Sequence, residues 1–286
     1  MYAQPTLATR FASSTRVLRS EFPLAETQMR QAAPSIFAKG KHISRSQRYT
    51  YIPTIDVLHG LQREGFEPFM VAQGNSRIEG KTEYTKHMIR MRHVARDGGR
   101  PATPEANEII LINSHDGASS YQLLAGKFRF VCCNGMVVGE ASDDIRIAHK
   151  GDVRDEVISG AFRVLDNFAA IDESTEAMKV IDLHPEEERA FARAAITLRY
   201  GAQLEGQPSA PITAEQLLQV RRPEDQGNSL WLSLQRVQEH VTRGGLPGRT
   251  VQGRRMRTRE VASIDRNVSL NRALWVLAEE MRKLKA

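Results

Sequence analysis

The sequence predicts an α+β protein in which an antiparallel sheet has helices on one face and is followed by a helical C-terminal part. Between residues 69 and 133, short apolar or alternating stretches follow one another with turn signals between them, as in consecutive antiparallel strands. From residue 152 onward, apolar residues recur every three or four positions, which is typical of helices with one buried side.

The expected strands cover residues 69–72, 84–94, 108–113, 121–125 and 128–133. Asp116-Gly117, Gly126 and Asn134-Gly135 are the expected turns, because glycine adopts backbone conformations that other residues avoid. Connections this short predict a meander, in which each strand pairs with the next.

Helices are expected on both sides of this block. One covers residues 54–64, with Thr54 as its N-cap and Gly65 at its end. A long helix begins at Asp152 and continues to Phe168. The other expected helices begin at Pro185, follow the capping box of Thr213 and Gln216, cover residues 229–241, and carry Leu270, Leu274, Leu277, Met281 and Leu284 on one face.

These elements suggest three regions. Residues 1–50 are weakly patterned and form a basic N-terminal arm, residues 51–182 form the core of sheet and helix, and residues 183–286 form a helical region with an arginine-rich segment. The first twenty residues carry three arginines and no acid, which is typical of a flexible arm and also of an organelle transit peptide.

Composition indicates whether the protein is membrane-bound and in which kind of compartment we expect it. The longest purely aliphatic run, Ile109 to Ile112, is far too short to cross a bilayer, so we expect no membrane association. The two cysteines, Cys132 and Cys133, are adjacent, where an ordinary disulfide would be strained. A reducing compartment fits best, and we expect a cytoplasmic protein.

Charge is segregated along the chain. Residues 1–150 carry 20 Lys and Arg against 14 Asp and Glu, residues 151–235 carry 8 against 15, and residues 236–286 carry 12 against 5. Such segregation favours an anionic partner. The alternative is that the acidic middle neutralises the basic parts inside the fold.

One face of the expected sheet looks basic. Alternation in the strand 84–94 places its cations on one side, with Tyr84, while His87 and His93 share the opposite, core-facing side. We expect a solvent-exposed face without acids, suited to single-stranded nucleic acid, with an aromatic ring for base stacking. Its residues are Tyr84, Lys86, Arg90, Arg92, Lys127 and Arg129. An ordinary solvated face is the alternative.

The densest basic signal lies near the C-terminus. Residues 240–259 contain six arginines, several glycines and no acid. Arginine makes forked contacts to phosphate, and glycine lets the backbone approach an anion. These candidate phosphate contacts are Arg243, Arg249, Arg254, Arg255, Arg257 and Arg259. The alternative is a surface loop whose arginines pair with the acidic middle of the chain.

Motifs for catalysis are weak. The stretch from Gly74 to Thr82 resembles a phosphate-binding loop, but it has five residues between its glycines where that motif has four. Ser114-His115-Asp116 has the residue types of a catalytic triad, yet Asp116-Gly117 is better explained as a hairpin turn. We expect no metal, no cofactor and no catalytic residue, and binding rather than enzymatic activity.

Three longer motifs carry a family resemblance. They are Phe128-Arg-Phe with Cys132-Cys133-Asn134-Gly135-Met136, Ser229-Leu-Trp231 through Arg243-Gly-Gly, and Arg255-Met-Arg-Thr-Arg259 before Asn271-Arg-Ala-Leu-Trp275. As a set they resemble the phage/plasmid-like family, a domain of unknown function (number nine hundred thirty-two), over most of the chain beyond about residue 50. The resemblance implies a prophage or plasmid origin and brings no established catalytic residues.

The sequence therefore predicts a mobile-element protein that binds single-stranded DNA. The order of helix, antiparallel strands and long helix also resembles phage single-strand annealing proteins, so strand annealing in recombination or element maintenance is included, as is assembly of several copies. One alternative is an anti-defence module that binds a host protein through the acidic segment 172–225. Another is a hydrolase built around His115 and Cys132.

Overall fold

The computed structural model describes residues 15–45, 49–76, 78–94, 104–131, 134–139, 141–149, 153–201 and 210–285. Contacts divide the chain into two compact units. Unit 1 is Met1–Gly135 with Ala141–Phe168 and Ala262–Ile264, and unit 2 is Met136–Glu140 with Ala169–Val261 and Asp265–Ala286.

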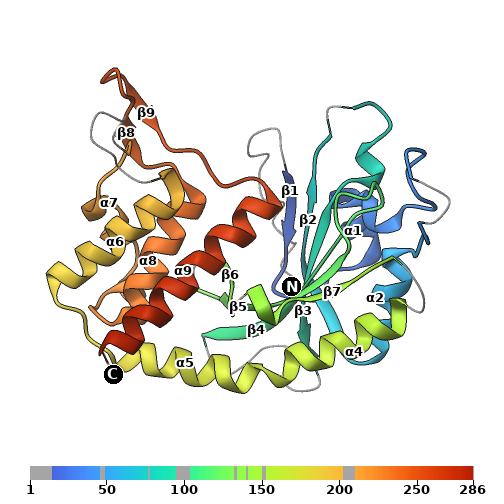
Figure 1. The fold of residues 1–286 in the computed structure, drawn as a ribbon, viewed down its shortest axis with the longest axis horizontal. Helices are drawn as coiled ribbons and strands as arrows, with labels where there is room; N and C mark the ends of the chain where they lie inside the picture. Colours follow the sequence, from blue (N-terminus) through green and yellow to red (C-terminus); the bar gives the residue numbers. More distant parts are fainter. Residues whose placement is uncertain are drawn as a thin grey trace, which may run out of the picture. The chain divides into compact units, whose positions relative to one another are not determined.

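Unit 1 is built on an antiparallel 7-stranded sheet with helices beside it (Figure 1). The strands are β1 (Thr15–Arg19), β2 (Phe66–Gly74), β3 (His87–His93), β4 (Glu105–Asn113), β5 (Tyr121–Arg129), β6 (Asn134–Val137) and β7 (Ile145–Ile147). The helices are α1 (Glu26–Ala32), α2 (Thr54–Arg63) and α4 (Val153–Asp166), with the 3-10 turns η1 (Pro34–Phe37), η2 (Thr82–Tyr84) and η3 (Ala141–Asp143). Strands β1 to β6 lie in sequence order, and β7 pairs with β5, so the expected meander is confirmed.

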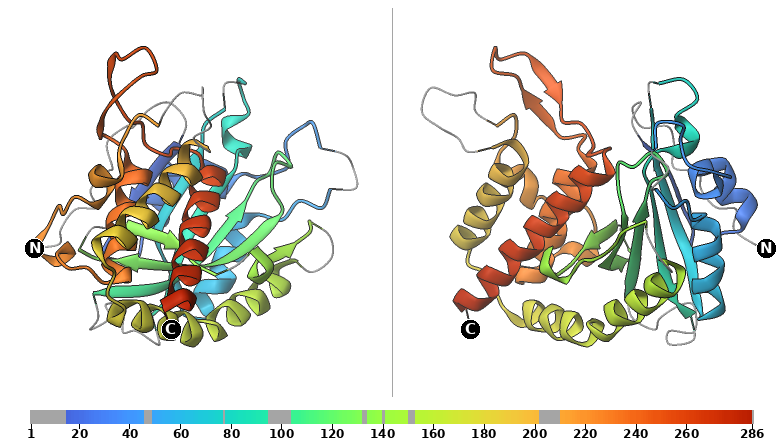
Figure 2. Two further views of the ribbon diagram at one scale, coloured as in Figure 1. Left: turned by 60° about the vertical axis from the view of Figure 1, so that its left-hand side comes forward. Right: turned by 45° about the vertical axis from the view of Figure 1, so that its right-hand side comes forward.

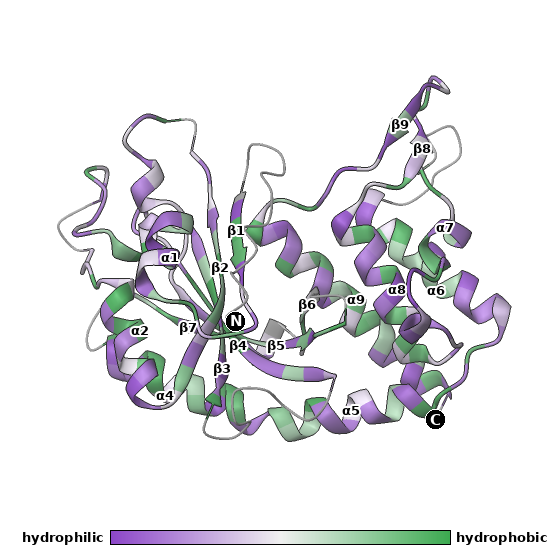
Figure 3. Ribbon diagram, turned by 180° about the vertical axis from the view of Figure 1, so that it is seen from behind, coloured by the Kyte–Doolittle hydropathy of each residue, from purple (hydrophilic) through white to green (hydrophobic). Residues whose placement is uncertain are grey.

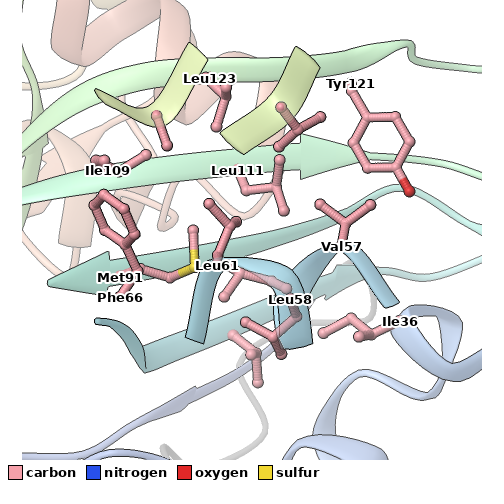
Figure 4. Close-up of a cluster of buried hydrophobic side chains, with 14 of the residues drawn as sticks. Ile36, Val57, Leu58, Leu61, Phe66, Met91, Ile109, Leu111, Tyr121 and Leu123 are labelled. Atoms are coloured by element: carbon pink, nitrogen blue, oxygen red, sulfur yellow. The ribbon is translucent and has the colours of Figure 1, made fainter. Parts of the chain in front are cut away.

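The predicted α+β fold is confirmed, and the core of unit 1 lies between the sheet and its helices. Val71, Ile89 and Leu111 occupy neighbouring positions on three strands and are fully buried. Leu58 and Leu61 of α2 pack into the same cluster (Figure 4). Burial of large aliphatic side chains on this scale is the main stabilising contribution of the sheet–helix layer.

The segment expected to be a loosely packed arm is, from Thr15 onward, part of the fold. Strand β1 pairs with β2, and Leu18 is 3% exposed. Met29 of α1 and Ile36 of η1 are completely buried in the core cluster. The weak hydrophobic pattern hid this because three short elements, separated by prolines, each supply only one or two core side chains.

Strand β5 joins two stretches that the sequence suggested were separate strands with a turn at Gly126. Gly126 instead lies inside β5 opposite Glu108, and a Cβ there would lie 2.7 Å from Nη2 of Arg90. A glycine within a strand often marks such a close approach. Gly135 in β6 has the same relation to the guanidinium of Arg90.

The expected exposed basic face is wrong in two respects. First, Arg90, Arg92, Lys127 and Arg129 are all less than a tenth exposed. Second, they do not share a face. Arg90 lies opposite Ile110, which lies opposite Leu124, so Lys127 and Arg129 alternate onto the other, helix-covered side.

Glu108 compensates the two arginines of β3. Its carboxylate is 1% exposed and accepts from Nε of Arg90 and, at 2.9 Å, from Nη2 of Arg92. The Arg92 guanidinium also lies 4.2 Å from the centre of the Phe69 ring and 4.5 Å from that of Phe128. Two buried charges that would otherwise be costly are therefore held by one carboxylate and aromatic faces.

Unit 2 consists of helices and one small hairpin. The helices are α5 (Phe168–Val180), α6 (Pro185–Tyr200), α7 (Ala214–Leu218), α8 (Leu230–Arg243) and α9 (Ile264–Lys285), with the 3-10 turn η4 (Pro223–Asp225). The hairpin pairs β8 (Pro247–Arg249) with β9 (Arg255–Arg257). In both views of Figure 2 this hairpin extends away from helices α6, α7 and α8.

Local sequence signals explain these helices. Pro185 stands at the first position of α6, and three glutamates follow in its first turn. Ser229 caps α8 by accepting from the N–H of Leu232, and Gly244 ends it with a φ of 65°. The long helix expected from Asp152 to Phe168 corresponds to α4, which ends at Asp166, and Phe168 begins α5.

We predict that Glu108→Gln destabilises the protein by roughly 3 to 5 kcal/mol, because it removes the charge of a buried carboxylate that contacts two buried guanidinium groups. Urea unfolding followed by circular dichroism measures this. The exposed Glu83 provides the control, since Glu83→Gln should change stability by less than about 0.5 kcal/mol. Equal stability of the two variants would contradict the role assigned to Glu108.

Candidate functional site

Most of the predicted phosphate-binding residues lie on or beside the hairpin of unit 2. We call Leu246–Arg259 the arginine hairpin. Figure 3 shows the hydrophilic character of its strands. Five of the six predicted arginines lie in it and are exposed: Arg249, Arg254, Arg255, Arg257 and Arg259. None of these five forms an ion pair with any residue that the structure describes.

The pairing of the hairpin concentrates positive charge. Arg249 lies directly opposite Arg255, and Arg257 lies two residues further along β9 on the same face. Like charges opposite each other in a two-stranded ribbon are unfavourable. An anion bound between them would remove this repulsion, so the arrangement is suited to a polyanion.

Main-chain hydrogen bonds close the base of the hairpin. The N–H of Thr258 donates to the carbonyl of Leu246 at 2.9 Å, and the N–H of Gly245 donates to the carbonyl of Thr258 at 2.8 Å. The Arg257 side chain adds a further bond, because its Nη1 donates to the carbonyl of Gly245 at 2.9 Å. The arginines are therefore presented by a fixed backbone and not by a loose loop.

Arg243 has a different environment from the other five. It ends α8, and its Nη1 lies 3.1 Å from Oε1 of the buried Glu239. Arg221 and Arg222 also contact that carboxylate. Burial alone would raise the pKa of Glu239, but the guanidinium groups outweigh it and the pKa is lowered. Arg243 thus contributes to an internal ion cluster.

The remaining predicted residues do not join this site. Tyr84 lies in η2, half-buried, with its ring edge-to-face to that of His42 at 5.4 Å between centroids. Lys86 is half-buried beside the start of β3. With Arg90, Arg92, Lys127 and Arg129 buried, the sheet supplies no continuous basic surface.

A second cluster, which the sequence did not predict, lies in unit 1 at one end of the sheet. Here polar side chains from separate elements, most of them buried, form a network around the hydroxyl of Thr54, the first residue of α2. We call it the histidine network. Its side chains are Ser35, Tyr49, Thr54, His87, Asn113, His115, Tyr121 and His149.

The Thr54 hydroxyl is the centre of the network. It lies 2.9 Å from Nε2 of His87 and 3.1 Å from Nε2 of His115. Nδ2 of Asn113 donates to it at 3.0 Å, and the Tyr121 hydroxyl lies at 3.3 Å. A hydroxyl donates once and accepts twice, so we assign donation to His87 and acceptance from His115 and Asn113.

The network continues through Asn113. Its Oδ1 lies 3.0 Å from Nε2 of His149, whose ring stacks on Tyr49 with 4.5 Å between centroids. The Tyr49 hydroxyl donates to the carbonyl of Ser114 at 3.1 Å. The chain of hydrogen bonds therefore connects α2, β3, β4 and the loop that follows β4.

Burial keeps the imidazoles neutral. It lowers the pKa of His115 to about 4, with a further contribution from His149, and it lowers the pKa of His87 and of His149 as well. Nδ1 of His115 and Nδ1 of His149 are buried and have no hydrogen-bond partner. Neutral imidazoles joined by a hydroxyl can transfer protons to one another. Thr54 and His115 are completely buried, so these two groups do not contact a ligand in solvent.

Asp116, the third residue of the triad-like motif, does not contact His115 through its side chain. Burial would raise its pKa, but the Ala118 N–H and Lys81 outweigh this, and the pKa is lowered. Its Oδ2 lies 3.2 Å from Nζ of Lys81, and Oδ1 accepts from Ala118. Gly117 has a φ of 78°, so the turn predicted at Asp116-Gly117 is confirmed.

The sequence shows the run of arginines that forms the hairpin, and it does not predict the histidine network. Thr54 was expected to cap α2, but Pro53 occupies the N-cap position and the Thr54 hydroxyl turns into the network. The available signal was the alternation of the strand 84–94, which placed His87 on the core side, as confirmed by its complete burial. Cys132 and Cys133, invoked for a hydrolase, lie outside the described residues.

No arrangement for a metal or a membrane span is present in the described parts of the chain. There, no group of three or more His, Cys, Asp or Glu residues could hold a metal ion. Of the helices that the structure describes, none has the length and apolarity required to cross a bilayer.

Comparison with known proteins gives a family but no activity. Residues 41–275 match the family model named "Domain of unknown function (DUF932)". The chain is 46% identical over 275 residues to UPF0380 protein YafZ of Escherichia coli (strain K12), covering 96% of this chain and 97% of that protein. UPF0380 protein YfjQ of the same organism has the same identity and coverage. No solved structure matches the chain.

We predict that acid destabilises the fold through the histidine network. The folded-state pKa of His115 is about 4 and its ordinary value is 6.5, so below 6.5 the unfolded chain binds the proton first. The free energy of unfolding therefore has its full value above pH 6.5. Protonation of His115 alone lowers it by roughly 3 kcal/mol when the pH is reduced to 4. Thermal unfolding as a function of pH measures the loss.

A matched pair of variants isolates the effect. His115→Gln should make stability less dependent on pH across this range, whereas His184→Gln, which changes an exposed histidine, should leave the profile as it is. The assignment is wrong if His115→Gln retains the full pH dependence.

Proposed function

This chain belongs to the DUF932 family, and we propose that it binds nucleic acid, with single-stranded DNA as the favoured form. The observation that carries the proposal is the arginine hairpin, in which five exposed arginines have no ion-pair partner among the described residues. Arginines that were needed only for folding would be expected to contact carboxylates, as Arg90, Arg92 and Arg243 do.

The choice of nucleic acid follows from the chemistry of the ligand. Guanidinium groups form forked, charge-assisted hydrogen bonds with phosphate, and a narrow row of them fits a repeated phosphate better than a single carboxylate. Contacts of this kind position the chain on a backbone without selecting its sequence. The predicted cations of β3 and β5, which are Arg90, Arg92, Lys127 and Arg129, are buried and have no part in the proposed contact surface.

Single strands are favoured because an aromatic ring lies near the hairpin. Tyr200 ends α6 and is half-buried, and the Arg199 guanidinium lies 5.6 Å from its ring centre. Nη2 of Arg199 donates to the carbonyl of Arg259 at 2.9 Å. Tyr200 therefore replaces Tyr84 as the residue proposed to stack on an unpaired base, which duplex DNA does not offer.

The wider setting is part of the same proposal. We expect action in the cytoplasm, in the maintenance or recombination of a prophage or plasmid, with strand annealing by assembled copies as the specific role. Binding of this kind needs no cofactor. Strand β1 ends the sheet order in the described part of the chain, and edge strands of this kind can pair with a strand of another copy.

The acidic segment 172–225 is the basis of the competing proposal, an anti-defence protein that binds a host protein. Several of its acids are engaged within unit 2: Glu186 with Arg189, Glu187 with Lys285, Glu188 with Arg236, and Asp225 with Arg222. These pairs reduce the acidic surface left for a partner, whereas the arginine hairpin keeps its charge. We therefore favour nucleic acid.

We predict that replacing Arg254, Arg255 and Arg257 by Ala weakens binding to single-stranded DNA and lowers its salt dependence. The slope of log affinity against log salt should flatten by roughly 2, because each phosphate contact on a single strand contributes about 0.7. Fluorescence anisotropy with a labelled oligonucleotide across a salt series measures both quantities. A matched duplex should bind more weakly than the single strand.

The control removes the same charge elsewhere. Arg63, Arg163 and Arg266 are exposed and lie outside the hairpin. Their triple Ala variant should retain the salt slope of the unmodified protein. Equal slopes for all three proteins would exclude the hairpin as the binding site, and stronger binding to duplex would exclude the preference for single strands.

A further inference from the structure

A groove runs beside the arginine hairpin, entirely within unit 2. Its volume is about 830 Å³, within the range typical of sites for small ligands. Its walls are the segment that leads into α7, including Pro211 and Ile212, and both strands of the hairpin, including Met256. Arg249, Arg255 and Arg257 line the same groove.

Gly248 shapes this groove by close approach. The N–H of Arg249 donates to the carbonyl of Pro211 at 3.2 Å, and a Cβ at position 248 would lie 2.3 Å from that carbonyl oxygen. Only glycine allows the hairpin to lie this near the segment before α7. The hydrogen bond between Arg249 and Pro211 therefore fixes the distance between the two backbone segments that form the walls of the groove.

The polar groups around the groove restrict its ligand. Gln216 is engaged at both ends, since Nε2 donates to the carbonyl of Pro247 at 2.8 Å and Oε1 accepts from the N–H of Thr213 at 2.9 Å. Arg255 makes no side-chain hydrogen bond with a described residue, and Arg257 uses Nη1 for the carbonyl of Gly245. Donor capacity therefore remains on guanidinium groups, next to an apolar wall of proline, isoleucine and methionine.

We propose that this groove takes one nucleotide of the bound strand, with its base against Pro211 and Met256 on one face of the hairpin and its flanking phosphates on Arg249, Arg255 and Arg257, which alternate onto the other face. The inference rests on the proposed function and adds that the protein contacts bases as well as the backbone. Guanidinium groups beside apolar side chains match a ligand that has an anionic part and a flat, weakly polar part, and a nucleotide unit of a single strand has both. A methionine sulfur packs favourably against such a ring.

The test compares two single strands of equal length and charge. One is oligothymidine, and the other is an abasic strand, which has the same phosphates and no bases. Anisotropy should show that the protein binds oligothymidine about three- to tenfold more tightly, because only that strand fills the groove. The salt slope should be the same for both strands, because their phosphate contacts are equal.

Two variants assign this difference to the groove. Met256→Ala and Met256→Gln should each bring the two affinities together while leaving the salt slope unchanged. The second variant keeps the length of the side chain, so a folding defect in the first does not prevent the test. Val251→Ala, at an exposed position of the hairpin outside the groove, should retain the preference of the unmodified protein.

The outcomes separate this inference from the proposed function. Equal binding of both strands by the unmodified protein, with a normal salt slope, would overturn the base site and leave phosphate binding intact. Unchanged preference in both Met256 variants would also overturn it. If neither strand binds in a salt-dependent way, both proposals fail.

Discussion

The carboxylate of Glu108 is the constraint on which the sheet of unit 1 depends. Both faces of this sheet are buried at β3 and β4, yet β3 carries two arginines on the face opposite the helices. One acid at the facing position of β4 accepts from both guanidinium groups. The glycines at positions 126 and 135 leave room for the Arg90 side chain. The charge cluster of Arg90, Arg92 and Glu108 therefore also restricts which residues can occupy positions on β5 and β6.

Local signals predicted much of the fold from the sequence. Helix caps such as Ser229 and the proline at the start of α6 act within a few residues of where they stand, so they can be recognised in an isolated sequence. The order of the strands also followed, because short connections leave little choice of neighbour. Strand β1 was missed because its place in the sheet depends on pairing with β2, more than forty residues later.

The candidate sites show the same limit. Arg255 and Arg257 could be predicted because they belong to a dense run of arginines in the sequence. Lys127 was assigned to the wrong face because alternation fixes sides only within one strand, whereas the relation between strands is set by their register. The histidine network could not be predicted, since the residues around Thr54 come from segments that only the folded sheet brings together.

The two clusters treat charge in opposite ways. Around Thr54, burial has removed charge, and the imidazoles serve as neutral hydrogen-bonding groups. In the arginine hairpin, the guanidinium groups are exposed to water, so their charge carries little desolvation cost. Arg249 and Arg255 nevertheless repel each other across the two strands. The first arrangement satisfies polar groups inside the fold, and the second is the one that we propose to contact a partner.

The closed base of the arginine hairpin has a consequence for how this family can diversify. The chain enters at Leu246 and leaves at Thr258, two residues joined by a main-chain hydrogen bond. The stretch between them is also tied to the rest of unit 2, because the N–H of Arg249 donates to the carbonyl of Pro211 and Gln216 donates to the carbonyl of Pro247. Exchange of this segment with that of a relative would therefore have to include the residues around Pro211 and Gln216, because the hairpin and the segment before α7 are held together as one unit.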